Sequence, residues 1–511
     1  MKKTMCLLIA MMLAITALTG MAVAEEREII EITVTGSRNA YCDNWEDTEF
    51  AKSVLERFGI KLIDQSFSSE EWTVQYGLLF ASGELPDLFV NTGWNMNTVS
   101  DYGSQGFLLS LNDLIETSGV YCKAVFDANP DMQRIVTSPD GNIYCLVNGS
   151  AIPANMANRN WINEKWIENV GMTYPETLED LYAVLCAFRD QDANGNGDPS
   201  DEIPASGTIL HEIVLNALGI PTKSSSGAGF YVNAEDEVTM IATDALYKVF
   251  LTYMHQYYEE GLLDSATFVQ SGSEFNAKIG EGRVGAYTLA APWLYESEET
   301  AWDYRYFGGL TSEYNSNKIV GASSGVDSWA AVAISASCAH PERVFEMLDW
   351  LYSDEGSTVG FIGEENVGWK WVNEAEGDWA RVLPEGWTDS DEAYRGGTLT
   401  ILGLNLYRSE EWKLFKPTGN NVWLYDQYTD YAVPYFTSAF PSVVLTEEEL
   451  DSISGIATDI ESYVTDATTR FIVGEEDIES GWDTFQNTLR SMGVEDYTAV
   501  YAEAYARFMG K

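Results

Sequence analysis

The sequence has few cationic residues for its length. Among 511 residues, 29 Lys and Arg stand against 79 Asp and Glu, which gives a formal net charge of −50. Nucleic acids and anionic lipid surfaces are bound through basic surfaces, so this charge argues against both as partners. Apolar residues are not lacking, since 45% of the chain is hydrophobic and 13% is aromatic. That content is enough for large packed cores and excludes bulk disorder.

Cysteine and histidine are scarce as well, with six and three copies. Five cysteines follow residue 24, an odd number without a C-x-x-C pair: Cys42, Cys122, Cys145, Cys186 and Cys338. This pattern excludes a disulfide scaffold and predicts buried free thiols. His211-Glu212 has no second histidine four residues later, which excludes the helix of a zinc protease.

A long apolar run occurs only at the start of the chain. Met1-Lys2-Lys3 precedes the run from Met5 to Thr19 and the small residues Ala22-Val23-Ala24. This order predicts an exported protein with a signal peptide over residues 1–24. The alternative is a membrane anchor, which needs about 20 apolar residues. Leu18-Thr19-Gly20-Met21 resembles a bacterial lipobox without its cysteine, so no lipid anchor is expected.

The first part of the mature chain alternates strand and helix patterns. Strands are predicted at 30–34, 60–63 and 88–90, and helices at 50–58 and 72–79. Such alternation predicts an α/β fold with a mostly parallel sheet between helices. Ligands of these sheets bind beyond the carboxyl ends of the strands, which here are the loops 38–45 and 91–97.

Helical patterns dominate the later part of the chain. Helices are predicted to begin at Thr177 and Pro341, and Thr446 with Glu449 forms a capping box. Two further helical faces follow at 478–492 and 497–508. The C-terminal region is therefore predicted to be helical.

The segment from Asp190 to Pro204 has the most specific chemical pattern. Oxygen-bearing side chains alternate with small residues at 192, 194, 196 and 198. Ca²⁺ takes about six to eight oxygen ligands, and the EF-hand loop supplies them with the same alternation. Ile203 occupies the twelfth position in place of glutamate, so Asp201 and Glu202 are the expected closing ligands. The segment predicts a structural calcium site, and the alternative is a solvated acidic turn.

Short segments spread over most of the mature chain carry a family resemblance. They are Ser82-Gly83-Glu84-Leu85-Pro86-Asp87, Gly106-Phe-Leu-Leu-Ser-Leu111, Gly141-Asn-Ile-Tyr144, Arg159-Asn-Trp161-Ile-Asn163-Glu-Lys-Trp166, Pro175-Glu-Thr177-Leu, the 190–204 run, Pro341-Glu-Arg, Thr446-Glu-Glu-Glu and Phe471-Ile-Val-Gly474. Their shared order resembles the extracellular solute-binding proteins of bacterial ABC importers. It is most similar to the large oligosaccharide-binding branch that includes alginate-binding proteins.

The resemblance implies a two-lobed, periplasmic-binding-protein-like α/β fold, each lobe a mostly parallel sheet flanked by helices. The lobes are expected at residues 25–150 plus 292–375 and at 151–291 plus 376–511. An oligosaccharide would lie in the cleft, a hinge would close on it, and transmembrane permease subunits would receive it. The family's calcium ligands correspond to Asp192, Asn194, Asn196, Asp198 (through its carbonyl), Asp201 and Glu202, with one residue inserted before Asp201.

Candidate ligand-binding residues are aromatic or polar side chains in polar, Gly-rich or Asn-rich surroundings. Flat aromatic rings stack on the apolar faces of sugars, and fixed polar groups bind the hydroxyls. The alternatives are core packing for the aromatic residues and solvated loops for the polar ones. The candidates are Arg38, Asn39, Tyr41, Asn44, Trp45, Asn91, Trp94, Trp293, Asp327, Trp329, Glu365, Trp369, Trp371, Arg408 and Trp423.

The resulting hypothesis is a monomeric, non-catalytic solute-binding component of an ABC transporter, exported and extracellular or associated with the cell envelope. The strong negative charge favours a neutral oligosaccharide over a uronate. Two alternatives stay open, a secreted glycoside hydrolase with two cleft carboxylates and a surface lectin without a transporter. Gly321-Ala-Ser323-Ser-Gly325 has the letters of a nucleophile elbow, but an extended run is predicted after it instead of a helix.

Overall fold

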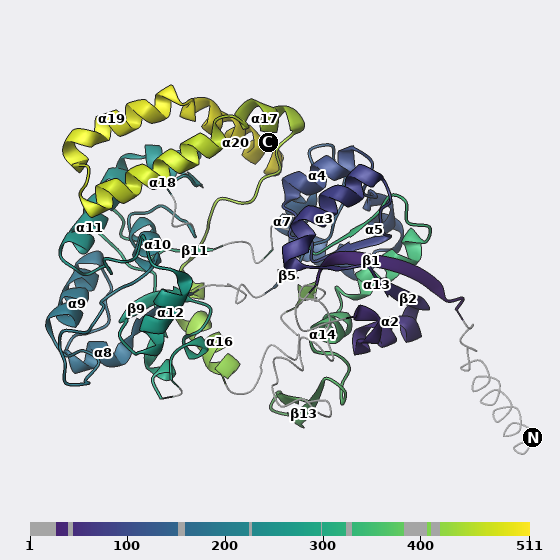
Figure 1. Ribbon diagram of the computed structural model, residues 1–511, viewed down its shortest axis with the longest axis horizontal. Helices are drawn as coiled ribbons and strands as arrows, with labels where there is room; N and C mark the ends of the chain where they lie inside the picture. Colours follow the sequence, from purple (N-terminus) through teal and green to yellow (C-terminus); the bar gives the residue numbers. More distant parts are fainter. Residues whose placement is uncertain are drawn as a thin grey trace, which may run out of the picture.

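The structure is a computed structural model that describes residues 27–38, 44–151, 159–223, 227–297, 299–322, 326, 330–382, 406–409 and 420–511. The expected signal peptide, residues 1–24, lies outside these ranges. The described residues form two lobes, each with its own hydrophobic core (Figure 1). Among the helices they contain, none combines the length and the apolarity that crossing a membrane requires.

The first lobe is built on a sheet with the strand order β12-β4-β1-β2. Its strands are β1 (Ile30–Arg38), β2 (Ile60–Asp64), β3 (Phe67–Ser68), β4 (Leu88–Val90) and β12 (Val332–Ile334). β1 pairs in parallel with β2, β3 and β4, whereas β12 runs antiparallel to β4. The mostly parallel sheet that the sequence predicts for this lobe is confirmed.

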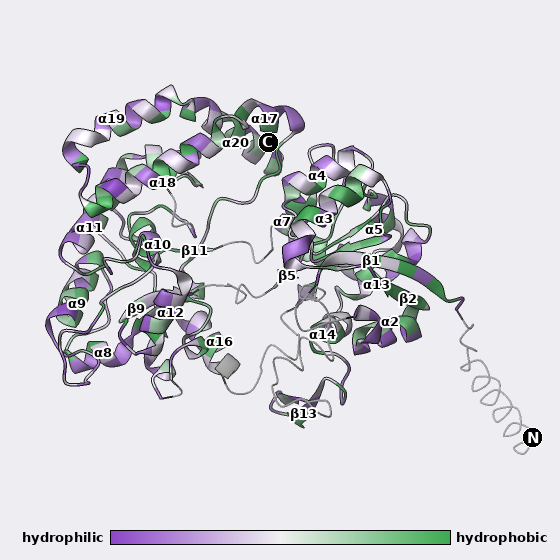
Figure 2. Cartoon of the chain, in the orientation of Figure 1, coloured by the Kyte–Doolittle hydropathy of each residue, from purple (hydrophilic) through white to green (hydrophobic). Residues whose placement is uncertain are grey.

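Helices cover this sheet and bury their apolar faces in the first core. They are α2 (Glu49–Phe58), α3 (Ser69–Ser82), α4 (Met96–Ser104), α5 (Asn112–Ser118), α6 (Tyr121–Ala128), α7 (Pro130–Val136), α13 (Pro341–Trp350) and α14 (Asp354–Ile362), with the short helix η1 (Trp45–Asp47). Thr48 caps the start of α2, and Gly59 ends it in the left-handed conformation, as helix-stop signals predict. Hydrophobic and hydrophilic residues alternate around α2, and around α18 (Ala457–Val473) of the second lobe (Figure 2).

A buried carboxylate joins two of these helices. Asp349 on α13 is 5% exposed and accepts hydrogen bonds from the backbone N–H groups of Val120, Tyr121 and Cys122, at distances from 2.8 to 3.2 Å. These N–H groups open α6, where they have no partner within the helix and no capping side chain of their own. A negative charge at a helix N-terminus is favourable, so Asp349 caps α6 from a distant part of the chain.

The second lobe is built on a sheet with the strand order β10-β6-β9. β6 (Arg159–Asn163) pairs antiparallel with both β9 (Ala286–Leu289) and β10 (Tyr304–Tyr306). This differs from the mostly parallel sheet that was expected for each lobe, because β10 and β9 both run against β6. β11 (Val320–Ala322) and β16 (Phe436–Ser438) pair in parallel in this lobe, and β7 (Phe230–Val232) forms a hairpin with β8 (Val238–Met240).

Many helices surround the second sheet, including the last ones in the chain. They are α8 (Glu164–Asn169), α9 (Leu178–Asp190), α10 (Ile209–Ala217), α11 (Ala245–Glu259), α12 (Gly272–Gly280), α16 (Asn420–Tyr431), α17 (Glu447–Ile453), α18 (Ala457–Val473), α19 (Ile478–Ser491) and α20 (Val494–Phe508), with the short helices η2 (Ile241–Thr243), η3 (Pro292–Leu294), η4 (Ala301–Asp303) and η7 (Val433–Tyr435). The predicted capping boxes at Thr177 and Thr446 are both present. The prediction of a helical C-terminal region is confirmed (Figure 1).

The hydrophobic cores divide the chain differently from the expected lobe boundaries. Tyr304, Phe307 and Leu310 pack in the second lobe although residues 292–375 were expected in the first, because β10 pairs with β6. Leu406 and Tyr407 pack in the first core although residues 376–511 were expected in the second. β15 (Tyr407–Arg408) accounts for this, since it pairs with β5 (Gly149–Ser150) of the first lobe.

One extended segment belongs to both cores. Val444 packs in the first core, whereas its neighbours Val443 and Leu445 pack in the second, since successive side chains of an extended chain point in opposite directions. Leu445 N–H donates to Asn97 Oδ1 of α4 at 2.8 Å. Arg507 of α20 holds this segment by donating to Val444 O at 2.9 Å.

The four described cysteines are free thiols, and three of them, Cys122, Cys145 and Cys338, are buried. The buried free thiols that the sequence predicts are therefore present at these positions. Burial raises the pKa of Cys145 to about 12, so this thiol stays protonated and unreactive.

Candidate functional site

The strand ends next to the crossings between the lobes form the candidate binding region. In the second lobe, Arg159 at the start of β6 pairs with Leu289 at the end of β9. In the first lobe, β5 pairs in parallel with β15. The backbone of Gly149 in β5 also forms an isolated β-bridge with that of Val326. β5 and β15 form a two-stranded sheet of their own beside the main sheet of the first lobe.

Four tryptophans gather at this edge of the second lobe, and we call them the tryptophan cluster: Trp161 of β6, Trp293 of η3, Trp302 of η4 and Trp423 of α16. Trp423 stacks on Trp161 with ring centroids 5.3 Å apart and planes inclined by 17°. It also meets the rings of Trp293 and Trp302 edge to face, at 5.9 and 5.4 Å. Three distant parts of the chain, β6, the η3–η4 region and α16, thus build one aromatic surface.

The tryptophan cluster has a buried base and an accessible side. Trp161 is completely buried, and its Nε1–H donates to Leu289 O at 2.9 Å, which fixes the ring. Trp293 and Trp423 are partly buried, and Trp302 is 40% exposed. Exposed faces of fixed tryptophan rings are suited to stacking on the apolar face of a flat solute.

Polar side chains precede Trp161 on β6. Arg159 donates to Ala290 O at 2.7 Å and lies over the ring of Tyr428 at 6.0 Å. Asn160 accepts a hydrogen bond from Thr288 Oγ1 at 2.7 Å. Glu212 of α10 adjoins Asn160, and burial raises the pKa of its carboxyl to about 7. The start of β6 therefore combines a cation with an amide, and the amide adjoins a buried carboxyl whose pKa is about 7.

Of the predicted binding residues, the structure brings Trp293 and Trp423 together in the tryptophan cluster. Trp161 and Trp302 were not among the predicted residues. Trp161 lies in the matched segment Arg159–Trp166, and Trp302 follows the polar run Glu296–Thr300 and precedes Asp303, so polar surroundings could have selected it.

The predicted residues of the first lobe have different surroundings. Asn91 and Arg38 lie at the carboxyl ends of the parallel strands β4 and β1, and Asn91 Nδ2 donates to Ser37 O at 2.9 Å. Asn44 caps η1 by accepting a hydrogen bond from Glu46 N–H. Trp45 and Trp94 are 2% and 4% exposed and pack in the first core, where a soluble ligand has no access to them in this structure.

The remaining candidates do not join the tryptophan cluster. Trp369 and Trp371 form a separate small cluster with Ile362 around the hairpin of β13 (Trp369–Asn373) and β14 (Asp378–Arg381), and Glu365 is exposed beside it. Arg408 is half-buried in β15, at the edge of the first lobe. Asn39, Tyr41, Asp327 and Trp329 lie outside the described residues.

The loop after α9 folds as a succession of side-chain-to-backbone turns. Asp192 Oδ2 accepts a hydrogen bond from Gly197 N–H at 3.0 Å, and Asn194 and Asn196 each accept one from the N–H two residues later. Gly195 and Gly197 have positive φ angles of 75° and 93°, which residues with a side chain rarely adopt. The alternation of oxygen side chains and glycine in the sequence therefore produces a tight wrap.

The carboxylates of this loop leave acceptor capacity unused inside the wrap. Asp192 Oδ1 and Glu202 Oε2 are buried without a hydrogen-bond partner, and burial raises the pKa of Glu202. Asp201 accepts from the side-chain amides of Asn194 and Asn196 at 3.2 and 3.0 Å. Nowhere in the described ranges do three or more His, Cys, Asp or Glu side chains converge as metal ligands, so a cation here also needs amide or carbonyl oxygens. The donor set is oxygen only, as Ca²⁺ prefers.

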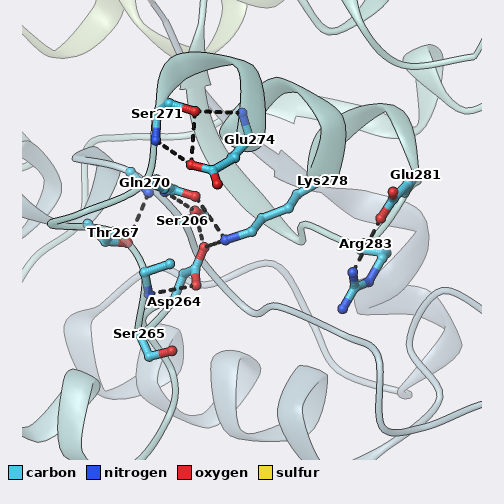
Figure 3. A network of polar contacts seen from close by, with 12 residues as sticks. Ser206, Asp264, Ser265, Thr267, Gln270, Ser271, Glu274, Lys278, Glu281 and Arg283 are labelled. Atoms are coloured by element: carbon cyan, nitrogen blue, oxygen red, sulfur yellow. Dashed lines mark hydrogen bonds and ion pairs between the residues drawn. The ribbon is translucent and has the colours of Figure 1, made fainter.

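Neighbouring elements hold this loop in place. Arg283 Nε donates to Asp201 O at 3.0 Å, and the backbone of Ile203 pairs with that of Arg283 and Gly285. Just beyond the loop, Ser206 Oγ donates to Asp264 Oδ2 at 2.8 Å. Figure 3 shows Lys278 reaching from α12 to the same carboxylate, at 2.7 Å. The loop is thus anchored to the sheet and to a polar network beside it.

The histidines do not form a catalytic arrangement. His211 is buried against the rings of Phe250 and Phe268, His255 Nδ1 faces Ile472 O, and His340 precedes α13. Of the elbow-like segment, residues 323–325 lie outside the described residues, and the next element after it is the strand β12, as the sequence predicts.

Comparisons with known proteins agree with the two-lobed fold. The model of the family "Bacterial extracellular solute-binding protein" matches residues 44–358, more than half of the chain. The sequence is 25% identical over 479 residues to the fructooligosaccharide ABC transporter substrate-binding protein FusA of Streptococcus pneumoniae, covering 87% of this chain and 84% of FusA. The structure is similar to that of FusA in complex with kestose, at 22% identity and a TM-score of 0.73, covering 94% of this chain and 100% of that one.

Two further structures have the same fold. An extracellular solute-binding protein of Bifidobacterium longum subsp. infantis has a TM-score of 0.79 at 21% identity, covering 95% of this chain and 99% of that one. The alginate-binding protein AlgQ2, in a structure without calcium ion, has a TM-score of 0.67 at 20% identity, covering 94% and 98%. A further similar structure is that of an EF-hand mutant of FusA in complex with fructo-nystose.

Proposed function

Because the chain belongs to the bacterial extracellular solute-binding protein family, we propose that it captures an oligosaccharide between its lobes and delivers it to the permease of an ABC importer. The tryptophan cluster is the observation that carries this proposal. Its rings come from three parts of the chain, one ring buried as a base and one 40% exposed, which is the arrangement that sugar stacking requires. FusA, the relative at 25% identity, is a fructooligosaccharide-binding protein.

The proposed mechanism is capture on one lobe followed by closure. The sugar first stacks on Trp302, Trp293 and Trp423 of the second lobe. Arg38 and Asn91, at the carboxyl ends of β1 and β4, then approach from the first lobe and bind its hydroxyls. Both lobes contact the ligand only in the closed form, so the ligand stabilises closure by its additional contacts there. The pivots would lie where the chain passes from one core to the other, which is next to β5, between β11 and β12, and next to β15.

Binding and closure are tested together by calorimetry and small-angle scattering. The probes are kestose, maltotriose and a mannuronate trimer. We expect saturable binding of a neutral trisaccharide and a smaller radius of gyration in its presence. Release of reducing ends during incubation would instead support a glycoside hydrolase, and saturable binding with no change in scattering would support a rigid lectin. If none of the three sugars binds, the proposal of an oligosaccharide ligand fails.

We propose that the ligand is neutral and that the protein acts as a monomer. The net charge of −50 repels polyanions at long range, and this repulsion weakens as salt screens it. A mannuronate trimer is therefore expected to bind more weakly than maltotriose or kestose, and to gain affinity as the salt concentration rises. Sedimentation of the protein at micromolar concentration measures the oligomeric state.

We propose further that the loop from Asp192 to Glu202 holds Ca²⁺. Asp192, Asn194, Asn196, Asp201 and Glu202 would supply side-chain oxygens, and Asp198 would supply its carbonyl. The unused buried oxygens of Asp192 and Glu202 support this assignment, because a cation offsets their cost of burial. The ion would have a structural role, since it lies on the loop after α9 and not in the tryptophan cluster. Mass spectrometry under native conditions would measure its stoichiometry.

We propose export by a signal peptide over residues 1–24, with release of the mature protein without a lipid anchor. Met21 stands where a lipoprotein would have cysteine, and no thioether can form there. Expression in a bacterial host followed by mass measurement of the N-terminus tests this. Cleavage after Ala24 is the expected result, and an uncleaved or acylated N-terminus would contradict it.

A further inference from the structure

Arg305 of β10 occupies an unusual position between two aromatic rings. Its guanidinium carbon lies 3.9 Å from the ring centroid of Tyr174 and 3.8 Å from that of Tyr431. Nη1 forms an ion pair with Glu164 at 3.2 Å, and the side chain is 22% exposed. Tyr174 is itself fixed, because its hydroxyl donates to Tyr306 O at 2.8 Å. The guanidinium therefore joins the fixed ring of Tyr174 to the ring of Tyr431 in α16.

Tyr431 is the last residue of α16, the helix that carries Trp423. Eight residues separate the two, which in an α-helix is about 12 Å along the axis. Between them, Gln427 Oε1 accepts a hydrogen bond from Tyr306 N–H at 3.0 Å, and Tyr428 packs against Tyr306. β10 is an edge strand, so α16 lies along its open edge and is held there by side chains.

Only a planar cation can fill the gap between the two tyrosines. A guanidinium presents a flat face to each ring and still reaches a carboxylate with its edge, whereas the ammonium of lysine is a compact point charge. The orientation also separates Arg305 from the ligand surface. Along β10, Tyr304 and Tyr306 point into the core that includes Trp161, and Arg305 points to the other side of the strand.

We propose that Arg305 is a positioning residue for ligand binding, which fixes the end of α16 and thereby holds the Trp423 ring stacked on Trp161. This proposal rests on the proposed function, since Trp423 is assigned to the ligand surface there. Arg305 itself does not touch the ligand. Its loss lets the end of α16 move away from β10, so that Trp423 samples orientations in which it no longer forms a flat surface with Trp161 and Trp302.

The test uses the full mature chain and variants at both ends of the contact, Arg305→Met, Arg305→Lys and Tyr431→Leu. The stacked pair Trp161 and Trp423 gives an exciton couplet in circular dichroism near 230 nm, and Trp423→Ala defines the signal without it. Kestose and maltotriose affinities are measured by calorimetry. The matched control is Arg57→Met in the first lobe, because Arg57 also lies over an aromatic ring, Trp350 at 5.1 Å, and is paired with Glu355 and Glu364.

We expect Arg305→Met to reduce the couplet and to weaken trisaccharide binding about tenfold, with Arg305→Lys unable to restore either. Tyr431→Leu should have the same effects, and combining it with Arg305→Met should add little, because both remove one interaction. Arg57→Met should leave couplet and affinity unchanged. An unchanged couplet in Arg305→Met, or a reduced couplet with unchanged affinity, overturns the proposal. If the wild-type protein binds neither of these sugars nor the mannuronate trimer, the proposed function fails, and the couplet still decides whether Arg305 positions Trp423.

Discussion

Glu212 gives the protein a specific pH dependence of stability. It lies in the first turn of α10, and burial raises the pKa of its carboxyl to about 7, from an ordinary value of 4.5, although Lys223 and the Asn160 amide act in the opposite direction. The groups that face it from other elements are Tyr306 of β10 and Tyr428 of α16. An acid with a raised pKa binds its proton more tightly in the folded state. Folding therefore becomes less favourable as the pH rises from 4.5 to 7.

The difference between the two pKa values corresponds to about 3 kcal/mol of stability. Water reaches part of the Glu212 side chain, which reduces this to roughly 1–2 kcal/mol. Glu212→Gln removes the titrating group and keeps the shape. We therefore expect the variant to be more stable than the wild type by roughly 1–2 kcal/mol at pH 8 and equally stable at pH 4.5.

Urea unfolding followed by tryptophan fluorescence, at pH 4.5, 6 and 8, measures this difference. Other carboxyls also titrate over this range, so the quantity of interest is the wild type minus the variant at each pH. Glu503→Gln on α20 is the matched control, because this side chain is exposed. If wild type and Glu212→Gln differ by the same free energy at all three pH values, burial does not perturb this carboxyl and the reasoning is wrong.

Three further outcomes follow from the contacts. Asp349→Ala should lower the free energy of unfolding by about 2–4 kcal/mol, because the buried Cys122 N–H loses its charged acceptor. Asp349→Asn should lower it by less, because its amide oxygen still accepts; urea titration measures both variants. Removing calcium with EDTA should lower the melting temperature. Adding 1 mM Ca²⁺ should then raise the free energy of unfolding by about 4 kcal/mol if the Kd is near 1 µM, and should not do so in Asp192→Asn. Recovery with Mg²⁺ alone would argue against a calcium site. Trp302→Ala should weaken trisaccharide binding about tenfold and leave the melting temperature nearly unchanged, since that ring is 40% exposed; calorimetry and thermal unfolding separate the two effects.

Much of the first lobe could be predicted because its signals are local. Thr48 and Gly59 mark the ends of α2, and the apolar runs of β1, β2 and β4 follow in sequence order. The loop from Asp192 to Glu202 is also local, and its alternating oxygens wrap as the sequence indicates. The caps and the loop join close neighbours in the chain, and the paired strands β1, β2 and β4 all lie within residues 30–90.

The second sheet and the site depend on distant partners, which single-sequence patterns do not specify. β6 receives β9 and β10 from more than 100 residues later, so neither their direction nor the position of residues 301–310 could be inferred from periodicity. Trp94 and Trp302 have similarly polar neighbours in sequence, yet one is in the core and the other is partly exposed. The helix α16 determines which tryptophans meet, and its contacts with β10 join residues that are far apart in the sequence.

The late position of the C-terminal helices also sets the order in which the chain can fold during synthesis. The second core contains residues from 162 to 504, and the ring of Phe230 stacks on that of Tyr501 at 4.3 Å. The hydroxyl of Tyr247 likewise pairs with Thr468 at 2.7 Å. A nascent chain that leaves the ribosome from its N-terminus cannot bury these residues until α18 to α20 have been made. The second lobe therefore stays incomplete until α18 to α20 have been made, whereas the first sheet can form earlier from strands that lie closer in the sequence.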